Sequence, residues 1–242
     1  LPSFGGVEQY TFNLAATLTH RGNRVIIVTS QIDNLPFSEK QKDGVQIYRI
    51  PSFNLVNGRL PMAFPSNQWN HLQTILKKEK INRIIIQTRL YTLSIMGLKF
   101  AYQNKIPSIM IEHGTSYVGM SNPVLQSAEI FYEKLLLNKA KKYCHSFCSV
   151  SEAGSQWLKS LNITSDAVLY NSVNEKRIHN FIADNTIDWR TKLGLSPDTP
   201  IIVFTGRLIR EKGIFQLITA FSHLKCEKKP ALVIAGDGPL YT

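Results

Sequence analysis

The 242-residue chain contains only three cysteines and no run of 18 or more apolar residues. Cys144, Cys148 and Cys226 give no disulfide framework, and such a small, odd number is typical of a reducing compartment. The spacing of the first two is wrong for half of a zinc site, so no metal is expected. The lack of a long apolar run excludes a membrane-spanning helix. No secretory signal is visible, although a chain that begins at Leu1 makes this weak evidence.

Two nucleotide-related patterns are also lacking. No Gly-x-Gly-x-x-Gly follows a strand, which disfavours a nicotinamide-binding enzyme. No zinc finger, recognition helix or aromatic-flanked RNA motif accompanies the formal net charge of +11. A surplus of this size still favours an anionic partner, such as a nucleotide or an acidic membrane surface. Because 43% of the residues are hydrophobic, a buried core is expected.

Short apolar runs alternate with amphipathic segments along the chain. The runs are apolar on both faces, as strands of a parallel sheet covered by helices must be. They occupy residues 25–30, 45–50, 83–88, 108–112, 146–150 and 167–170. The sequence therefore predicts an α/β fold with a doubly wound parallel sheet.

Helical spacing and capping residues place the helices between these strands. Apolar residues between positions 7 and 18 fall on one helical face, and Gly22 is the expected C-cap. Ser66 and Ser151 are typical N-caps for two further helices. Residues 124–143 predict a helix with a basic face, which suits an anionic membrane or, more simply, solvent.

The pattern predicts one domain and the beginning of another. Residues 1–174 form the first domain, which opens on a loop into a helix where a doubly wound fold normally opens with a strand. Residues 175–199 are polar, with one short helical piece near 189–193, and are expected to connect the domains. Residues 200–242 start a second domain with a strand at 201–205, a helix at 213–224 and a strand at 231–235. This unit is too small to cover both faces of its sheet, so the second domain is expected to be incomplete.

Two candidate sites lie in the first domain. Gly5 and Gly6 open a helix whose N-terminus presents free N–H groups to a phosphate, although a tight turn alone also explains two glycines. His113 follows the strand at 108–112, at the end of the sheet that faces the ligand crevice. It is able to bond a sugar hydroxyl or a phosphate, or to serve a structural role.

Two more candidates follow the strands of the second domain. Arg207 and Lys212 lie between Gly206 and Gly213, in a loop that joins a strand to a helix. A guanidinium fork and a mobile ammonium are together suited to neutralise a diphosphate leaving group without a metal. After the last strand, small residues allow close approach of a nucleotide, or simply form a turn. These are Gly236, Asp237, Gly238 and Pro239.

Together, these motifs resemble those of GT-B glycosyltransferases of family 4, and the resemblance covers essentially the whole chain. Bacterial polysaccharide and lipopolysaccharide transferases are the most similar. The motifs, in chain order, are Gly5-Gly6-Val7-Glu8, Glu112-His113-Gly114, Val150-Ser151-Glu152, residues 170–174, residues 206–213 and residues 236–239.

The resemblance implies two Rossmann-like domains, a nucleotide-diphosphate sugar as donor, and transfer with retention and without a metal or other cofactor. Arg207 and Lys212 match the pair that grips the donor diphosphate, and Gly5-Gly6 match the loop that approaches the same phosphates. His113 matches a histidine near the transferred sugar, and residues 206 and 236–239 match the loops around the nucleotide. The implied acceptor is a glycan or lipid-linked molecule in cell-surface polysaccharide synthesis. The implied location is the cytoplasm or the inner face of the cell membrane.

The sequence departs from the family in two places. The glutamate pair of the second domain is absent from these 242 residues, so the chain alone is expected to have little or no transferase activity. Residues 171–174 read Asn-Ser-Val-Asn where the family more often has Asn-Gly-Val-Asp. A GT-B nucleotide-sugar epimerase is the alternative enzyme, and a basic nucleic-acid-binding module is the alternative of another class. The scattered basic residues disfavour the module, so no nucleic acid is expected as a partner.

Overall fold

The computed structural model describes residues 5–31, 34–55, 60–119, 122–173, 175–184 and 187–241, apart from the side chains at 54, 55, 60 and 177. The chain divides into a first unit, Leu1–Ser172, and a second unit, Val173–Thr242. The first unit ends two residues before residue 174, where the first domain is predicted to end, and the domain assignment itself stays a prediction. Residues 1–4 and 174 of that predicted domain lie outside the described residues.

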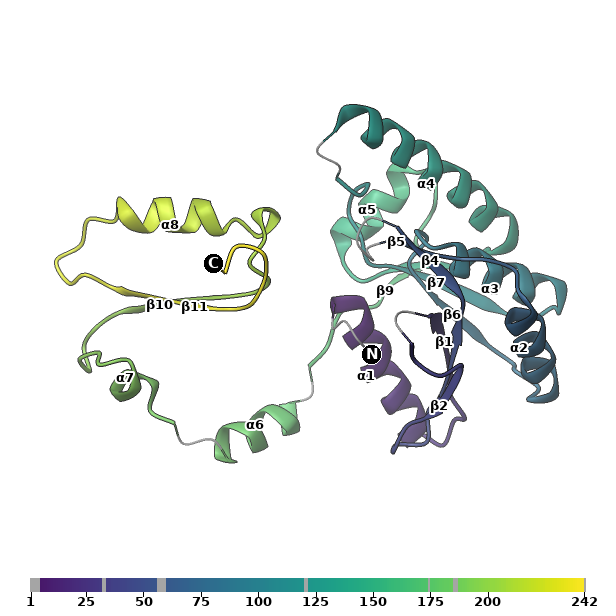
Figure 1. Ribbon diagram of the computed structural model, residues 1–242, viewed down its shortest axis with the longest axis horizontal. Coiled ribbons are helices and arrows are strands. Elements are labelled where there is room, and N and C mark those ends of the chain that lie inside the picture. Colours follow the sequence, from purple (N-terminus) through teal and green to yellow (C-terminus); the bar gives the residue numbers. More distant parts are fainter. Residues whose placement is uncertain are drawn as a thin grey trace. The chain divides into compact units, whose positions relative to one another are not determined.

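The first unit is a mixture of strands and helices (Figure 1). Its strands are β1 (Ile26–Ser30), β2 (Ser38–Lys40), β3 (Gln46–Ile50), β4 (Ser52–Leu55), β5 (Leu60–Ala63), β6 (Ile84–Gln87), β7 (Ser108–Glu112), β8 (Phe147–Ser149) and β9 (Ala167–Val168). Its helices are α1 (Gly6–His20), α2 (Asn67–Lys78), α3 (Thr92–Gln103), α4 (Pro123–Tyr143) and α5 (Glu152–Ser160).

One sheet of the first unit has the order β1-β3-β2, with β1 parallel to β3 and β2 antiparallel on the outside. Alternate strand residues face opposite helices because side chains of a strand alternate between its faces. Val45 and Ile47 pack with Ala15 of α1. On the other face, Ile50 packs with Trp69 and Leu72 of α2. Helices on both faces confirm the predicted doubly wound arrangement.

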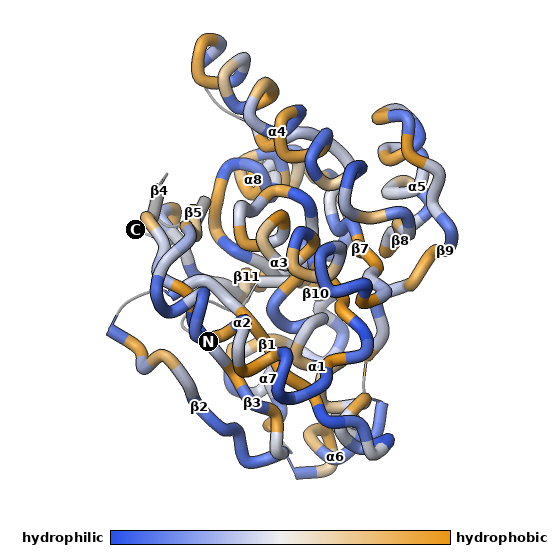
Figure 2. Tube along the Cα trace, turned by 90° about the vertical axis from the view of Figure 1, so that its right-hand side faces the viewer, coloured by the Kyte–Doolittle hydropathy of each residue, from blue (hydrophilic) through white to orange (hydrophobic). Residues whose placement is uncertain are grey.

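The second sheet has the order β6-β7-β8-β9, and all of its pairings are parallel. Its core cluster joins these strands to α3, α4 and α5. The buried members are Ile86, Ile95, Leu98, Met110, Leu136, Leu137, Ala140, Cys144, Phe147, Leu158 and Ile163. Hydropathy drawn along the chain shows apolar and polar residues alternating along α4 (Figure 2).

Within the described residues, no strand joins the two sheets. β1 and β6 are each at the edge of their own sheet, yet Ile26 and Val28 of β1 and Ile84 of β6 pack against the same core cluster. The predicted absence of a first strand stays a prediction.

Most elements lie where the sequence predicts them. Ser66 accepts a hydrogen bond from the N–H of Trp69 at 3.2 Å, and Ser151 accepts one from Gly154 at 3.1 Å, so both predicted N-caps are confirmed. The C-cap of α1 is Arg21, one residue before the predicted Gly22, which follows it with a φ of +80°. Four elements or pairs of elements were not predicted: the outer strand β2, the antiparallel β4–β5 pair, the helix α3 and a helix at 175–184.

The second unit contains α6 (Glu175–Asp184), α7 (Trp189–Lys192), β10 (Ile201–Thr205), a 3-10 turn (Arg210–Lys212), α8 (Ile214–Ser222) and β11 (Ala231–Ala235). The prediction of a single helical piece between the domains was wrong, because α6 precedes α7. β10 and β11 pair in parallel, and α8 lies along one side of them (Figure 1). Val203 of β10 is 60% exposed, as expected for a strand–helix–strand unit that covers one face of its sheet.

Candidate functional site

Two loops meet at the carboxyl ends of β10 and β11 in the second unit. The N–H of Gly206 donates to the carbonyl of Ala235 at 3.1 Å, and that of Leu208 donates to Asp237 at 2.8 Å. The N–H of Leu240 in turn donates to the carbonyl of Leu208 at 3.2 Å. The structure thus brings the predicted residues 206–213 and 236–239 together as one paired surface.

Glycines allow these two loops to approach each other. A Cβ atom added at Gly236 would lie far inside van der Waals contact with the carbonyl oxygen of Gly206. One added at Gly238, whose φ is +151°, would lie 2.6 Å from the carbonyl oxygen of Leu208. Both neighbours are backbone atoms that cannot rotate away. The close approach of the two loops therefore explains why glycine stands at both positions. The role of these residues beside a nucleotide stays a prediction.

Arg207 and Lys212 are exposed on the first of these loops. Neither side chain makes a hydrogen bond or an ion pair with any residue that the structure describes. The loop ends at Gly213, which has a left-handed φ of +74° and begins α8. These two cations, which have no partner among the described residues, lie in the segment that leads into the N-terminus of α8. The free N–H groups of a helix N-terminus also carry partial positive charge, so this segment favours the binding of an anion.

The first unit holds the other predicted residues. Gly5 is the N-cap of α1 and makes no side-chain capping bond, and a Cβ atom at Gly6 would contact nothing within 4 Å. One turn later, the ring of Tyr10 meets the His113 ring edge to face, with centroids 4.9 Å apart. The first turns of α1 therefore lie beside the end of β7, which brings Gly5 and Gly6 to the same region as His113.

His113 is half-buried and bonded to the strand beside it. Its Nε2 lies 2.7 Å from Oε1 of Gln87 at the end of β6, and because that oxygen only accepts, Nε2 carries the proton. Burial lowers the pKa of His113, so the ring is neutral near pH 7. Its Nδ1 makes no hydrogen bond with the described residues. It is therefore available to accept one from a ligand hydroxyl.

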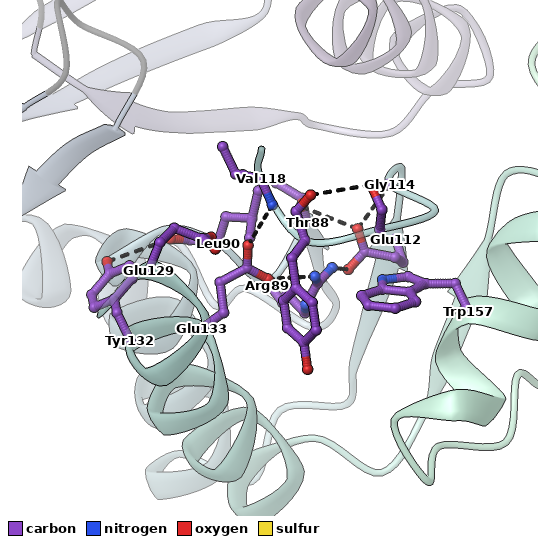
Figure 3. Close-up of polar contacts among 12 residues, drawn as sticks. Thr88, Arg89, Leu90, Glu112, Gly114, Val118, Glu129, Tyr132, Glu133 and Trp157 are labelled. Carbon is purple, nitrogen blue, oxygen red and sulfur yellow. Dashed lines mark hydrogen bonds and ion pairs between the residues drawn. The ribbon is translucent and has the colours of Figure 1, made fainter. Parts of the chain in front are cut away.

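Glu112, the residue before His113, belongs to a buried ionic cluster (Figure 3). Arg89, which follows β6, pairs through Nη1 with Oε2 of Glu112 at 2.6 Å and through Nη2 with Oε2 of Glu133 on α4 at 2.5 Å. All three side chains are at most 2% exposed. Charges so deeply buried are tolerated only when they are paired.

A further carboxyl group, Glu129, lies one turn before Glu133 on α4. Burial, together with the adjacent Glu133, raises the pKa of Glu129 to about 8. At pH 7 the Glu129 carboxyl is therefore mostly protonated, and it lies on the same helix as Glu133, which pairs with Arg89.

Three residues of this region were missed by reasoning from the sequence. Gln87 and Arg89 lie at and just after the carboxyl end of a correctly predicted parallel strand, and that position alone marks them as candidates. Tyr10 had no comparable signal, because its position fits the apolar face of the predicted helix that begins near residue 7.

Parallel sheets with polar and glycine-rich loops at their carboxyl ends define a doubly wound α/β protein of the ligand-binding type. Comparison with known proteins identifies the family. Residues 4–177 match the family model for Glycosyltransferase Family 4, and residues 185–242 match that for Glycosyl transferases group 1. The chain belongs to glycosyltransferase family 4.

Curated relatives align with nearly the whole chain. An uncharacterized glycosyltransferase from Methanocaldococcus jannaschii is 23% identical over 98% of this chain and 61% of its own length. An alpha-monoglucosyldiacylglycerol synthase from Acholeplasma laidlawii is 23% identical over 99% of this chain and 61% of its own length. The chain therefore spans about three fifths of the length of these relatives.

Solved structures share the fold. A sucrose-phosphate synthase from Thermosynechococcus elongatus has a TM-score of 0.65 and 16% identity, over 98% of this chain and 59% of that one. Anabaena HepE, solved in complex with UDP-glucose, has a TM-score of 0.57 and 14% identity, over 97% and 58%. These likenesses confirm the predicted GT-B fold class.

The residues that the structure describes hold neither a membrane-spanning helix nor a cluster of metal ligands. No helix among them is both long and apolar enough to cross a bilayer. No three His, Cys, Asp or Glu side chains among them are grouped as metal ligands. Metal-independent transfer stays a prediction.

Proposed function

We propose that the protein containing this chain is a retaining, metal-independent glycosyltransferase that uses a nucleotide-diphosphate sugar. The observation that carries the proposal is the pair of exposed cations Arg207 and Lys212 in the loop that leads into α8, neither of which is paired with a residue that the structure describes. Membership of glycosyltransferase family 4 supports the same donor class. A cation pair stabilises the negative charge that develops on a departing nucleoside diphosphate. The two side chains would thereby take the place of a metal ion.

The remaining predicted residues have complementary roles in this proposal. Gly206 and the 236–239 loop border the nucleotide, and Gly5 and Gly6 present the N–H groups of α1 to the diphosphate. His113 contacts the transferred sugar, with its neutral Nδ1 accepting a hydroxyl hydrogen bond. The acceptor is a glycan or a lipid-linked molecule of the cell surface.

Replacing Arg207 or Lys212 with alanine will weaken nucleotide binding by about 1 kcal/mol or more each, as expected for a lost charge-assisted contact. Calorimetry with UDP, GDP and ADP, without divalent metal, measures this in the protein expressed with its natural ends. Lys228→Ala is the matched control, because Lys228 is an exposed lysine whose only described ion pair is with Asp198 at 3.6 Å. Silent substitutions at both sites, or an equal loss in the control, would contradict the donor site.

The epimerase alternative makes a different product. An epimerase converts the nucleotide sugar without an acceptor, whereas a transferase releases the nucleoside diphosphate as the sugar moves. Product analysis in the absence of any acceptor therefore separates the two enzymes.

We also propose that the outer face of α4 contacts an anionic membrane surface, where a lipid-linked acceptor would lie. Its exposed residues include Val124, Phe131 and Leu135, which recur at helical spacing. Lys139 and Lys142 continue the same face toward the end of the helix and are also exposed. An apolar stripe followed by lysines is suited to a bilayer interface with acidic headgroups.

The double substitution Phe131→Ser and Leu135→Ser will reduce flotation with phosphatidylglycerol vesicles at least tenfold, because it removes the apolar contact. Phe53→Ser is the control, since Phe53 is similarly exposed on β4. The parent protein is expected to float with phosphatidylglycerol and not with phosphatidylcholine. Equal flotation with both lipids, or an equal loss in the control, would eliminate the membrane surface.

A further inference from the structure

The two carboxylates bound to Arg89 each use their second oxygen in the same way. Oε1 of Glu112 accepts the N–H of Gly114 at 2.9 Å, and Oε1 of Glu133 accepts the N–H of Val118 at 3.0 Å. The loop that follows His113 is therefore held at its beginning and near its end by carboxylates that share one guanidinium. Figure 3 shows Arg89 lying between these two attachment points.

Other contacts hold the same loop. The ring of Tyr117 meets the Trp157 ring edge to face at 4.9 Å, and the guanidinium of Arg89 lies 5.5 Å from the same Trp157 ring. The carbonyl of Val118 accepts a hydrogen bond from Gln126 at 3.0 Å. The loop thus has four points of attachment between Gly114 and Val118, and three of them lead directly to Arg89 or to its partners.

We propose that Arg89 is a positioning residue, which holds the Gly114–Val118 loop beside His113 in the conformation that the acceptor meets. This inference rests on the proposed transferase function for its biological meaning, while the geometry of the loop stands independently. Arg89 does not itself reach a substrate, because it is buried behind the loop.

The chemistry of the side chain explains why an arginine fills this position. A guanidinium presents several N–H groups in a fixed plane, so it binds two carboxylates at once and leaves a flat face for an aromatic ring. A lysine ammonium carries the same charge on a flexible stem without that planar fork. Arg89→Lys therefore keeps the charge and removes the geometry.

The test measures amide hydrogen exchange in the protein with its natural ends. In Arg89→Lys, the amides of Gly114 and Val118 are expected to exchange at least tenfold faster than in the parent. Arg49→Lys is the matched control: Arg49 is equally buried, pairs with Glu39 at 2.6 Å, and lies in the other sheet. The control is expected to leave both amides at parent rates.

A functional readout accompanies the exchange. With UDP-glucose as donor and phosphatidylglycerol vesicles containing diacylglycerol as acceptor probe, Arg89→Lys is expected to raise the KM of the probe at least tenfold. The KM of UDP-glucose should change less than twofold. A loss of general stability would instead reduce the amount of active protein and leave both KM values unchanged.

The outcomes separate this inference from the proposed function. A parent protein that binds and turns over no nucleotide sugar overturns the proposed function, while the exchange rates still decide whether Arg89 holds the loop. Parent-like exchange in Arg89→Lys, or equal acceleration in Arg49→Lys, overturns the positioning role. If Arg89→Lys does not fold, Glu133→Gln replaces it, and faster exchange at Val118 than at Gly114 is then expected.

Discussion

Replacing Gly236 with alanine will destabilise the loop pair of the second unit and abolish the nucleotide binding that we propose for it. The new methyl group would collide with the carbonyl oxygen of Gly206, and the carbon of that carbonyl would lie 3.0 Å away. Relief requires the backbone of one loop to move, which breaks the hydrogen bonds that Gly206 and Leu208 donate to the other loop. Forced overpacking of this kind costs about 2–4 kcal/mol, near the upper end of single substitutions.

Thermal unfolding and calorimetry with UDP, GDP and ADP, in the protein with its natural ends, measure both effects of the Gly236 substitution. Gly119→Ala is the control, because Gly119 is exposed and a Cβ atom there would meet nothing within 4 Å. We expect the control to retain parental stability within about 0.5 kcal/mol. Nucleotide binding of parental strength by Gly236→Ala would show that the paired loops are not needed for the donor site.

The strands and capped helices could be predicted because their signals are local. A continuous apolar run predicts a buried parallel strand wherever it lies in the chain, and the runs at 108–112, 201–205 and 231–235 match strands to the residue. The caps of α2 and α5 depend on a serine and on the N–H group of the third residue after it. The helix α6 carried a local signal as well, since Ile178, Phe181 and Ile182 share a helical face, but the polar residues around them obscured it.

The site was predictable only in part, because its contacts join residues far apart in the sequence. The sequence places His113 and Arg207 at strand ends, and that position follows from topology alone. It does not show that Arg89 pairs with Glu133, which lies 44 residues further along the chain. It also does not reveal that Gly236 faces Gly206, because the pairing of the two loops depends on the register of β10 with β11.

Replacing Glu129 with glutamine will make the first unit more stable at pH 7, although it removes an ionisable group. The pKa of Glu129 is about 8 in the folded protein, whereas the ordinary value is 4.5. Between these values the unfolded chain gives up its proton and the folded one keeps it. The unfolding free energy of the parent therefore falls as the pH rises, by about 1.4 kcal/mol per pH unit.

Glutamine does not titrate, and its amide resembles the protonated carboxyl in shape and in donating a hydrogen bond to Glu133. The variant is therefore expected to match the parent at pH 4 and to exceed it by roughly 3 kcal/mol at pH 7. Denaturant unfolding at several pH values between 4 and 9 measures the difference. Glu152→Gln, at an exposed glutamate of α5, is the control and should follow the parent within about 0.5 kcal/mol. A constant difference between Glu129→Gln and the parent across this range would show that Glu129 is already ionised in the folded protein, and that Arg89 then lies among three charged carboxylates.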